Sequence, residues 1–327
     1  MLRKVYGVDL GTSSVKIYSL SKDKKYREKN MVAIRNKRQI VAVGNEAYEM
    51  YEKTPVNIHV DCPIQNGKIA NISTMEVGLY LMLKRIESYT PFGSLIYFSI
   101  PVDATAVEKR AYYTVANGRM LQNNKVMMGE SPLADALALD IPLKTSKGSM
   151  LVNIGAQKTE LSVIASGRVI ISRSIPMGGM QMDEKIIGEV RKNYDLNIGN
   201  RTAHRLKAAM GRLNTQSKEV RKVVGIDSIS GLPREEVISS STVNEGISAC
   251  ADVIGAEIKS FLERTPPQIA YQIAQEGIYL AGGTARIPFI ESYLGNCTGC
   301  SFRLSELFEM STIEGLKKVI QNKELQY

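Results

Sequence analysis

Residues 150–165 read MLVNIGAQKTELSVIA, an apolar strand that enters a glycine turn and continues as a second strand of alternating character. Such a pattern predicts a β-hairpin with a tight tip. Residues 5–20, VYGVDLGTSSVKIYSL, have the same pattern. The matched positions are Asp9 with Asn153, Leu10 with Ile154, Gly11 with Gly155 and Ile17 with Leu161. Two matching hairpins far apart in one chain predict a duplicated architecture with two similar lobes.

A third glycine turn lies in GIYLAGGTARIPFIESYL, residues 277–294, where an apolar strand enters Gly282-Gly283 and we expect a helix to follow. A strand, a glycine turn and a helix in this order offer backbone N–H groups and a helix N-terminus to an anion or a sugar. One such loop indicates little, since many strands end in glycine turns. Three in one chain, two of them matched, predict a nucleotide cleft between the lobes.

Two segments have the apolar spacing of helices that pack on a core, residues 181–196 and 241–264. In the second, apolar side chains recur every three or four residues from Val243 to Phe261. Pro266-Pro267 then stops this helix. Together with the strands and turns, these helices predict a two-lobed α/β body.

The composition of the 327 residues is that of an ordinary globular protein, with 44% hydrophobic and 23% charged residues. This length predicts two domains or one large two-lobed body. The apolar runs are too short to span a membrane. The first residues, MLRK, lead straight into an apolar strand, which leaves no room for a signal peptide. We therefore expect a cytoplasmic protein.

The net charge of +9 would suit an acidic partner such as nucleic acid, an anionic membrane or a nucleotide. The cations are mixed with acids, however, and the chain has no Trp and no aromatic-basic pattern typical of single-strand binders. We expect no nucleic acid partner. Cys297 and Cys300 lack two further ligands at zinc spacing, because the two histidines, His59 and His204, lie elsewhere.

With the three loops placed, the chain resembles the actin-like ATPases, and within them the MreB family of bacterial cell-shape filament proteins. GVDLGTSSVKIY resembles the first phosphate hairpin of the family, and GSMLVNIGAQKTELSVIASGRVIISRSIPMGGMQMDEKI resembles the second. The stretches most specific to MreB are NIGNRTAHRLKAAMG, SGLPREEV and ERTPPQIAYQIAQEGIYLAGGTARI. The resemblance covers nearly the whole chain.

This resemblance implies an α/β fold of the actin-like, two-lobed type, with duplicated ribonuclease-H-like domains around a nucleotide cleft that holds ATP or ADP and Mg²⁺. Lobe I is expected to span residues 1–138, and lobe II residues 139–308. Residues 309–327 are expected to form a C-terminal helix that returns to lobe I.

The resemblance also implies which residues hold the nucleotide. In the first hairpin Asp9 matches the aspartate that binds the metal through water, and small residues let the backbone approach phosphate. These phosphate residues are Gly11, Thr12, Ser13 and Ser14. The second hairpin contributes Asn153, Gly155, Ala156, Gln157 and Lys158. The turns around sugar and base contribute Gly178, Gly179, His204, Lys207, Gly282, Gly283, Thr284, Ala285 and Arg286, the last near the adenine edge.

Several of these positions depart from the family pattern. Asn153 replaces an aspartate, which weakens the hold on metal-bound water, and His204 replaces a ribose-binding acid. Lys158 stands where a hydroxyl is usual, and would either pair with phosphate oxygens or point to solvent. Ser131 occupies the position of the catalytic glutamate in GESPLADALALDIP, with Glu130 one residue away as a possible substitute. Because a serine cannot take up the proton as a carboxylate does, we expect nucleotide binding without efficient turnover.

MreB-type proteins touch membranes through an N-terminal amphipathic helix or an apolar loop. Four residues before the first strand leave no room for the helix, so the candidate is the loop SYTPFGS, residues 88–94, with Tyr89 and Phe92. Packing of this loop on its own lobe is the alternative. The expected partners are further copies of the chain in a polymer, a sister MreB protein, and the cell-shape membrane proteins of the elongation machinery. The expected location is the inner face of the plasma membrane.

Three interpretations of function remain open. The first is an ATP-binding filament subunit that guides cell-wall synthesis and cell shape with impaired hydrolysis. The second is a working ATPase of the same family that uses Glu130, and the third is a non-polymerising adaptor on the actin-like fold. A sugar or acetate kinase is disfavoured, because the chain is too short for the usual sugar-kinase lobes.

Overall fold

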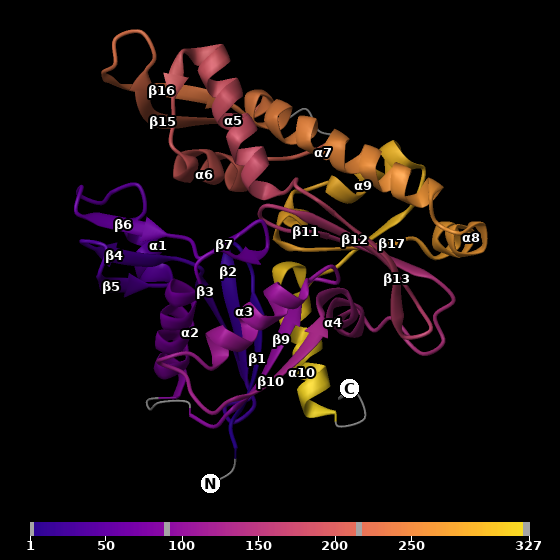
Figure 1. Ribbon diagram of the computed structural model, residues 1–327. Coiled ribbons are helices and arrows are strands. Elements are labelled where there is room, and N and C mark those ends of the chain that lie inside the picture. The colour runs from indigo at the N-terminus through magenta and orange to yellow at the C-terminus, as the bar shows by residue number, and fades with distance from the viewer. Residues whose placement is uncertain (1–2, 88–91, 214–217, 323–327) are drawn as a thin grey trace. The chain divides into compact units, whose positions relative to one another are not determined.

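The computed structural model describes residues 3–87, 92–213 and 218–322, and the chain divides into two compact units (Figure 1). Unit 1 runs up to Thr145 and also takes in Gly167–Val169 and the residues from Met310 onward. Unit 2 comprises Ser146–Ser166 and Ile170–Glu309.

Unit 1 is built on a five-stranded sheet with the strand order β10-β9-β1-β2-β3. The three strands β1, β2 and β3 form an antiparallel meander, whereas β9 and β10 add to β1 in parallel. The bounds are β1 Val5–Leu10, β2 Ser14–Ser19, β3 Lys24–Lys29, β9 Leu95–Ile100 and β10 Lys125–Glu130.

Helices cover both faces of this sheet. On one face α2 (Ile72–Glu87) and α3 (Ala106–Ala116) bury a cluster that includes Tyr6 and Phe98. On the other face α4 (Ser131–Ala138) and α10 (Ser311–Gln321) bury a second cluster. Alternation along each strand sends successive side chains to opposite faces, so strands buried on both sides are apolar almost throughout.

The rest of unit 1 consists of short elements beside the main sheet. They are β4 Val32–Arg35, β5 Gln39–Val43, α1 Asn45–Met50, β6 Ile58–Asp61, β7 Ile64–Gln65 and β8 Lys68–Ile69. The strands β5, β4 and β6 form a three-stranded antiparallel sheet, and β7 pairs with β8.

Unit 2 repeats the same sheet plan, with the strand order β13-β12-β11-β17-β18. Here β11 and β12 form the antiparallel hairpin, while β17 and β18 add in parallel. The bounds are β11 Ser149–Ile154, β12 Thr159–Ala165, β13 Arg168–Ile175, β17 Ile278–Ala281 and β18 Phe302–Leu304. The duplication predicted from the two matching hairpins is therefore confirmed, because each hairpin occupies the same place in its own sheet.

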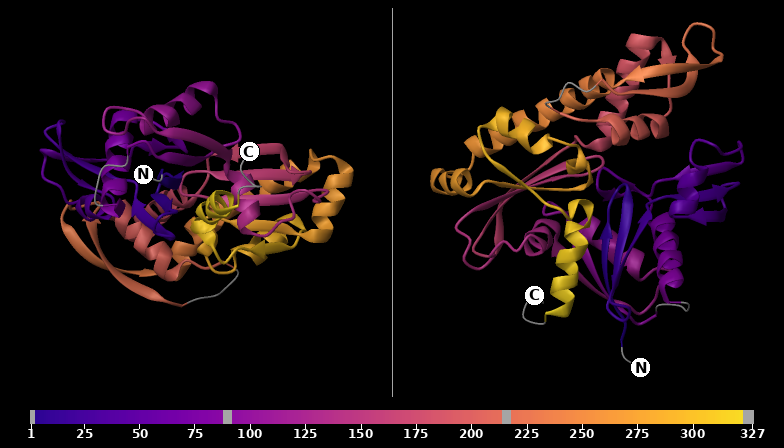
Figure 2. Two further views of the ribbon diagram at one scale, coloured as in Figure 1. Left: turned by 90° about the horizontal axis from the view of Figure 1, so that it is seen from below. Right: turned by 180° about the vertical axis from the view of Figure 1, so that it is seen from behind.

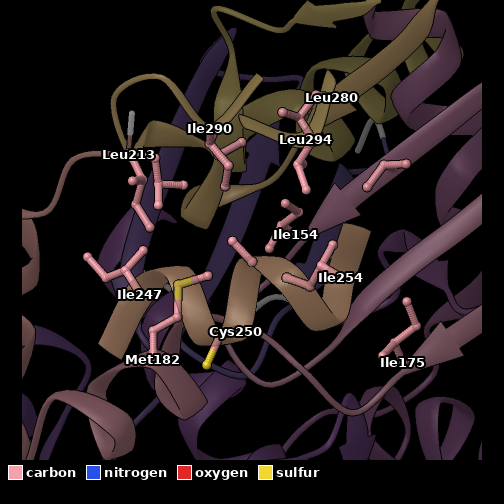
Figure 3. Close-up of a cluster of buried hydrophobic side chains, with 14 of the residues drawn as sticks. Ile154, Ile175, Met182, Leu213, Ile247, Cys250, Ile254, Leu280, Ile290 and Leu294 are labelled. Carbon is pink, nitrogen blue, oxygen red and sulfur yellow. The ribbon is translucent and has the colours of Figure 1, made fainter. Parts of the chain in front are cut away.

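The helices of unit 2 enclose its main apolar core, part of which Figure 3 shows around Ile154, Met182, Ile254 and Leu294. The remaining elements are α5 Gly179–Tyr194, β14 Leu196–Asn197, α6 Asn200–Met210, β15 Val220–Asp227, β16 Pro233–Ser239, α7 Ser240–Glu263, α8 Pro267–Glu276, η1 Gly283–Arg286, α9 Ile290–Thr298 and η2 Phe308–Met310. The two helices predicted from apolar spacing are α5 and α7, and α8 begins at the second proline of the predicted stop.

One predicted helix begins later than expected. After Gly282 the chain makes a short 3-10 turn, η1, and α9 starts only at Ile290. Pro288 and the left-handed residue Phe289, with φ of 68°, separate the two. The helix N-terminus therefore does not follow the glycine turn directly, because the proline ring and the left-handed residue interrupt helical geometry.

Residues 139–145, assigned from sequence to lobe II, group with unit 1 instead. The backbone N–H groups of Leu139 and Ile141 donate to the carbonyls of Asp135 and Ala136 at the end of α4, and the side chain of Ile141 is buried. Local hydrogen bonds thus tie this segment to the helix that precedes it. In the described part of the chain, no helix has the length and apolar character needed to cross a membrane.

Glu87, at the end of α2, is buried in unit 1 and contacts several polar side chains. It forms an ion pair with Lys4 and accepts hydrogen bonds from the hydroxyls of Ser19 at 3.1 Å and Ser21 at 2.7 Å. Burial by itself would raise the pKa of this carboxyl, but the hydrogen bonds from Lys4, Ser21 and Ser19 outweigh it and lower the pKa.

We expect Glu87→Gln to lower the free energy of unfolding by about 2 kcal/mol near neutral pH, because Lys4 loses its counter-ion. A carboxyl with a lowered folded pKa stabilises the protein fully above its unfolded pKa, and this contribution is lost as the pH falls through the folded pKa. Urea unfolding from pH 7 down to about pH 3 should therefore show the two proteins converging in acid. Ser21→Ala is the control, because it removes one hydrogen bond and no charge. If the difference in the free energy of unfolding between Glu87→Gln and the wild type stays constant with pH, the assignment is wrong.

Candidate functional site

In unit 1 the first hairpin forms a tight tip between β1 and β2. The N–H of Gly11 donates to the carbonyl of Ser14 at 3.2 Å, and Asn30 closes the turn from outside with a side-chain bond to the Gly11 carbonyl. A Cβ on Gly11 would lie 2.9 Å from the Ser14 carbonyl oxygen. Thr12 and Ser14 are buried, whereas Ser13 is exposed at the tip. Of the expected phosphate residues, Ser13 and the backbone around it are therefore the most accessible.

Asp9 lies directly below this tip and is already engaged. Its Oδ2 lies 2.9 Å from the Nζ of Lys16, its partner across the hairpin, and its Oδ1 accepts a hydrogen bond of 2.9 Å from Ser99. Lys16 is buried, so its charge is balanced locally by Asp9. Sequence analysis missed Lys16; the signal was a lysine between the core residues Val15 and Ile17, beside a candidate phosphate loop.

Ser131 and Glu130 lie where β10 passes into α4. Ser131 is the first residue of α4, and its hydroxyl donates to the carbonyl of Ile100 at 2.9 Å. Glu130 caps the helix from the last position of β10 without a side-chain capping bond. The serine hydroxyl is thus used to join two strand ends, and it carries no group that can accept a proton at neutral pH.

In unit 2 the second hairpin is tied to the start of α5. The N–H groups of Gly179 and Met180 donate to the carbonyls of Gly155 and Ala156, at 3.0 and 2.7 Å. Thr284 of η1 donates its hydroxyl to the same Gly155 carbonyl at 2.7 Å. Three segments expected to share one site, the β11–β12 turn, the α5 start and η1, therefore meet in unit 2.

Glycine is required at two of these positions by close approach. A Cβ on Gly178 would lie 2.7 Å from the Gly155 carbonyl oxygen, and a Cβ on Gly179 would lie 2.7 Å from the Thr284 hydroxyl and 3.1 Å from Lys207 Nζ. At 2.7 Å the neighbouring atom would have to shift, whereas the 3.1 Å contact is only unusually tight. The backbone thus packs closely here because both side chains are absent.

Lys207 of α6 is buried beside this glycine pair. Its ammonium donates to the Gly179 carbonyl and forms an ion pair of 2.8 Å with Asp183 of α5. Burial lowers the pKa of the Lys207 ammonium, although Asp183 acts in the opposite direction. His204, one turn earlier on α6, lies 3.3 Å from the other Asp183 oxygen and is about half exposed, with 46% of its side chain accessible.

Asp183 was missed by sequence analysis, and it alters the interpretation of His204. The expected ribose-binding acid is absent from position 204, but a carboxylate from α5 lies between His204 and Lys207. It lies one helical turn after Gly179 in the sequence, on the face of α5 that carries the buried Met182. The available signal in the sequence was an acid next to the apolar Met182, four residues after Gly179.

The remaining expected residues of unit 2 lie at the end of β11 and β17. Asn153 pairs in register with Ala281, and a Cβ on Gly282, which has φ of 97°, would lie 2.5 Å from the Asn153 side-chain oxygen. Ala285 is fully buried in η1. Arg286 donates to Glu309 at 2.8 Å and stacks on the ring of Phe308, with 4.3 Å from its guanidinium carbon to the ring centre.

The structure shows a third arrangement for Lys158, which was expected to contact phosphate or to point to solvent. Its Nζ lies 2.7 Å from Glu160 on β12, and both side chains are 19% exposed. The lysine charge is therefore paired within its own hairpin. In the candidate membrane loop, Tyr89 lies outside the described residues, whereas Phe92 is 56% exposed.

The donor set for a cation is sparse. Mg²⁺ prefers carboxylate oxygens and water in octahedral geometry. At the first hairpin tip Asp9 supplies a carboxylate, but the ammonium of Lys16 already neutralises its charge. Among the residues that the structure describes, no group of three or more His, Cys, Asp or Glu side chains could hold a metal ion. If a magnesium ion binds beside this hairpin, Asp9 is the carboxylate that would hold it.

Comparison with known proteins shows the family of the chain. Residues 3–326 match the family model described as MreB/Mbl protein. The chain is 32% identical over 298 residues to the cell shape-determining protein Mbl of Bacillus cereus, covering 90% of this chain and 89% of that protein. It is 32% identical over 322 residues to the cell shape-determining protein MreB of Escherichia coli, covering 94% and 92%.

Solved structures show the same fold. MreB 5 of Spiroplasma citri bound to AMPPNP has a TM-score of 0.93 at 28% identity, over 99% of this chain and 98% of that one. The MamK double helical filament has a TM-score of 0.80 at 20% identity, over 98% and 99% of the two chains, a likeness of fold alone. The predicted actin-like α/β fold is thereby confirmed.

Proposed function

Because this chain belongs to the MreB/Mbl protein family, we propose that it is an actin-like cytoskeletal filament subunit that binds ATP and turns it over slowly or not at all. The observation that supports nucleotide binding most directly is the cluster of Gly155, Gly179, Lys207 and Thr284 in unit 2. Similar chains support it as well, since MreB 5 of Spiroplasma citri has been crystallised with AMPPNP and with ADP.

In this proposal the backbone of the second glycine hairpin approaches the phosphates, and the buried Lys207 supplies a fixed positive charge near the nucleoside. Glycine turns suit this role because their N–H groups can approach phosphate oxygens without a side chain in the way. Lys207 is held by Asp183 and the Gly179 carbonyl. A cation held in this way needs no rearrangement to receive a polar ligand.

The absence of a carboxylate at positions 131 and 153, where the family has a glutamate and an aspartate, supports impaired hydrolysis. The Ser131 hydroxyl is committed to the Ile100 carbonyl, and Asn153 carries no charge. Bound magnesium would neutralise charge on the transferred phosphoryl group. Asp9, the carboxylate proposed to hold that ion through water, is itself paired with Lys16. The proton of an attacking water therefore has no carboxylate acceptor at position 131, and Glu130 is the alternative acceptor.

The cellular part of the proposal follows the curated relatives, which are named cell shape-determining proteins. We propose a polymer of this chain, alone or with a sister MreB, that guides cell-wall synthesis with membrane proteins of the elongation machinery. The polymer is placed at the inner face of the plasma membrane, with Tyr89 and Phe92 as the candidate contact. Weak insertion by one aromatic loop would gain strength by repetition along a filament.

We expect Gly179→Ala to weaken ATP binding by at least about tenfold. The new methyl group would displace either the Thr284 hydroxyl or Lys207 Nζ, and both hold the proposed site together. Gly188→Ala is the matched control, since it makes the same substitution on the exposed side of the same helix with no atom within 4 Å. Calorimetry with magnesium and ATP measures the affinities. Equal affinities for the two variants would contradict the proposed site.

Pelleting of the wild type with ATP, with and without anionic lipid, tests the filament part of the proposal. Sedimentation of assembled protein with ATP is expected. A chain that binds ATP yet stays in the supernatant at high concentration would favour the adaptor interpretation instead.

A further inference from the structure

Unit 1 has a groove between α2 and the small three-stranded sheet β5-β4-β6, which we call the β5 groove. Figures 1 and 2 show this sheet beside α2. The groove has a volume of about 370 Å³. It is lined by residues 40–43 of β5, Glu46 of α1, and Leu81, Lys84 and Arg85 of α2. None of these residues belongs to the proposed nucleotide site, so that site does not account for the groove.

The β5 groove follows the backbone edge of its strand. Successive side chains of a strand point to opposite faces, so a groove over one face would be lined by every second residue. Here four successive residues of β5 line the groove. Among the residues that the structure describes, β4 is the one strand that pairs with β5, and β5 therefore lies at an edge of its sheet. The backbone N–H and C=O groups of an edge are a template for a further strand.

The walls of the groove offer apolar surface beside this edge. Residues 40–42 of β5 and Leu81 of α2 are all partly exposed. Leu81, Lys84 and Arg85 lie on one face of α2, because residues three and four apart are neighbours on a helix. Aliphatic side chains of a strand added along β5 would therefore be removed from water against these residues, which favours binding.

Cationic side chains flank both ends of β5. Lys37 and Arg38 precede the strand in the exposed turn from β4. At the other end, the guanidinium of Arg85 lies 3.5 Å from the carbonyl oxygen of Val43. Lys84, also exposed, stands next to it on α2. A ligand that carries carboxylates is complementary to these charges.

The lining of the groove itself has a net positive charge. Its two cations are Lys84 and Arg85, and its one carboxylate belongs to Glu46. Glu46 lies 2.7 Å from Arg85 and balances that guanidinium. The ammonium of Lys84 lies 6.0 Å from the centre of the Tyr80 ring. Lys84 is therefore the cation of the lining at which a change of charge should alter binding most.

We propose that the β5 groove binds an extended segment of a partner protein, which adds to β5 as a further strand of the small sheet. Backbone hydrogen bonds to the edge of β5 hold the segment, and its side chains alternate between aliphatic residues and carboxylates. This inference goes beyond the proposed function, because the segment binds without nucleotide and without a second copy of the chain. Its failure would leave the nucleotide and filament proposals untouched.

Fluorescence anisotropy on the whole chain without nucleotide tests the proposal. The probes are labelled octapeptides in which Val, Ile, Leu or Phe alternates with Glu. We expect members of this panel to bind with a Kd of about 100 µM or lower at low salt. The same peptides with Lys in place of Glu should bind at least about tenfold more weakly, because like charges then meet. If no acidic peptide binds, or if the basic peptides bind as tightly, the proposal is wrong.

Charge reversal places the peptide in the β5 groove. Lys84→Glu should weaken the tightest acidic peptide by at least about tenfold. Lys109→Glu is the matched control, since it reverses an exposed lysine on α3 outside the groove, and it should bind as the wild type does. Both variants should unfold in urea nearly as the wild type does, because exposed charges contribute little to stability. Equal affinities of the two variants for the peptide would overturn the placement.

Backbone methylation distinguishes strand addition from a contact made by side chains alone. Two versions of the tightest peptide carry N-methyl groups on its odd or on its even amides. An added strand hydrogen-bonds through one edge, so one version should lose at least about tenfold in affinity and the other should keep it. Two versions that bind alike would overturn strand addition.

Two other occupants are excluded by the same variants. If no peptide binds, while Lys84→Glu lowers self-association in sedimentation equilibrium, the groove belongs to a second copy of the chain. If Lys84→Glu instead lowers sedimentation with vesicles of anionic lipid, the groove belongs to a membrane surface. Either result would overturn the proposal of a partner segment.

Discussion

Replacing Ser131 with glutamate and Asn153 with aspartate in one chain should raise phosphate release from ATP by about a hundredfold or more, because a positioned general base contributes roughly 10² to 10⁴ in rate. Ser131 now donates its hydroxyl to the Ile100 carbonyl and offers no proton acceptor. A glutamate there is compatible with the fold, since it would begin α4, where the helix dipole favours a negative charge.

The single variants show what each change contributes. Ser131→Glu alone should supply the acceptor but leave the metal-side position neutral, and Asn153→Asp alone should improve only the hold on metal-bound water. We therefore expect the double variant to exceed both. Glu130→Gln is the control for the alternative base: if wild type releases phosphate readily and Glu130→Gln abolishes it, Glu130 activates the water and the proposal of impaired turnover is wrong.

Gly315→Ala should lower the free energy of unfolding by about 3 kcal/mol, at the upper end for an overpacked contact. Helix α10 crosses α4 so closely that a Cβ on Gly315 would lie 1.8 Å from the Ala134 carbonyl oxygen and 2.4 Å from its carbon. The helices cannot separate freely, because Thr312 donates to Asp135 at 2.7 Å and Lys318 donates to the Leu137 carbonyl at 2.8 Å.

Gly188→Ala again provides the matched control. It places the same methyl group on an exposed position inside α5 with no atom within 4 Å, so helix propensity should raise stability by up to about 1 kcal/mol. Urea unfolding of both variants measures the difference. If Gly315→Ala is as stable as the wild type, the close crossing of α4 and α10 is wrong. A fluorescence probe placed in unit 1 would show whether the loss begins there.

Local patterns were enough to predict the sheet plan and the family. The two glycine hairpins, the apolar spacing of α5 and α7 and the proline stop before α8 all depend on residues close together in the chain. Such features follow from backbone sterics and strand or helix periodicity, which act over a few residues. The start of α9 was misplaced because Pro288 was overlooked and because residue type does not indicate the left-handed conformation of Phe289.

The sequence named candidate site residues, but it did not give their pairings. Three of the named segments meet in unit 2, yet sequence analysis missed that Asp183 holds Lys207 and that Lys16 neutralises Asp9. Lys158 was given two roles, and the structure shows it paired with Glu160. Charge pairing depends on distance in space, and side chains on separate strands or helices can be matched only after the sheet register and the helix packing are known.

By itself, the sequence determined the duplicated α/β plan, the membership of the MreB/Mbl family and the absence of carboxylates at positions 131 and 153. Only the tertiary structure decided which charges are already paired and where α10 approaches α4. The physical reason is the same in each case. Periodicity shows that a residue lies on one face of a strand or helix, but packing between distant segments decides whether that face is covered.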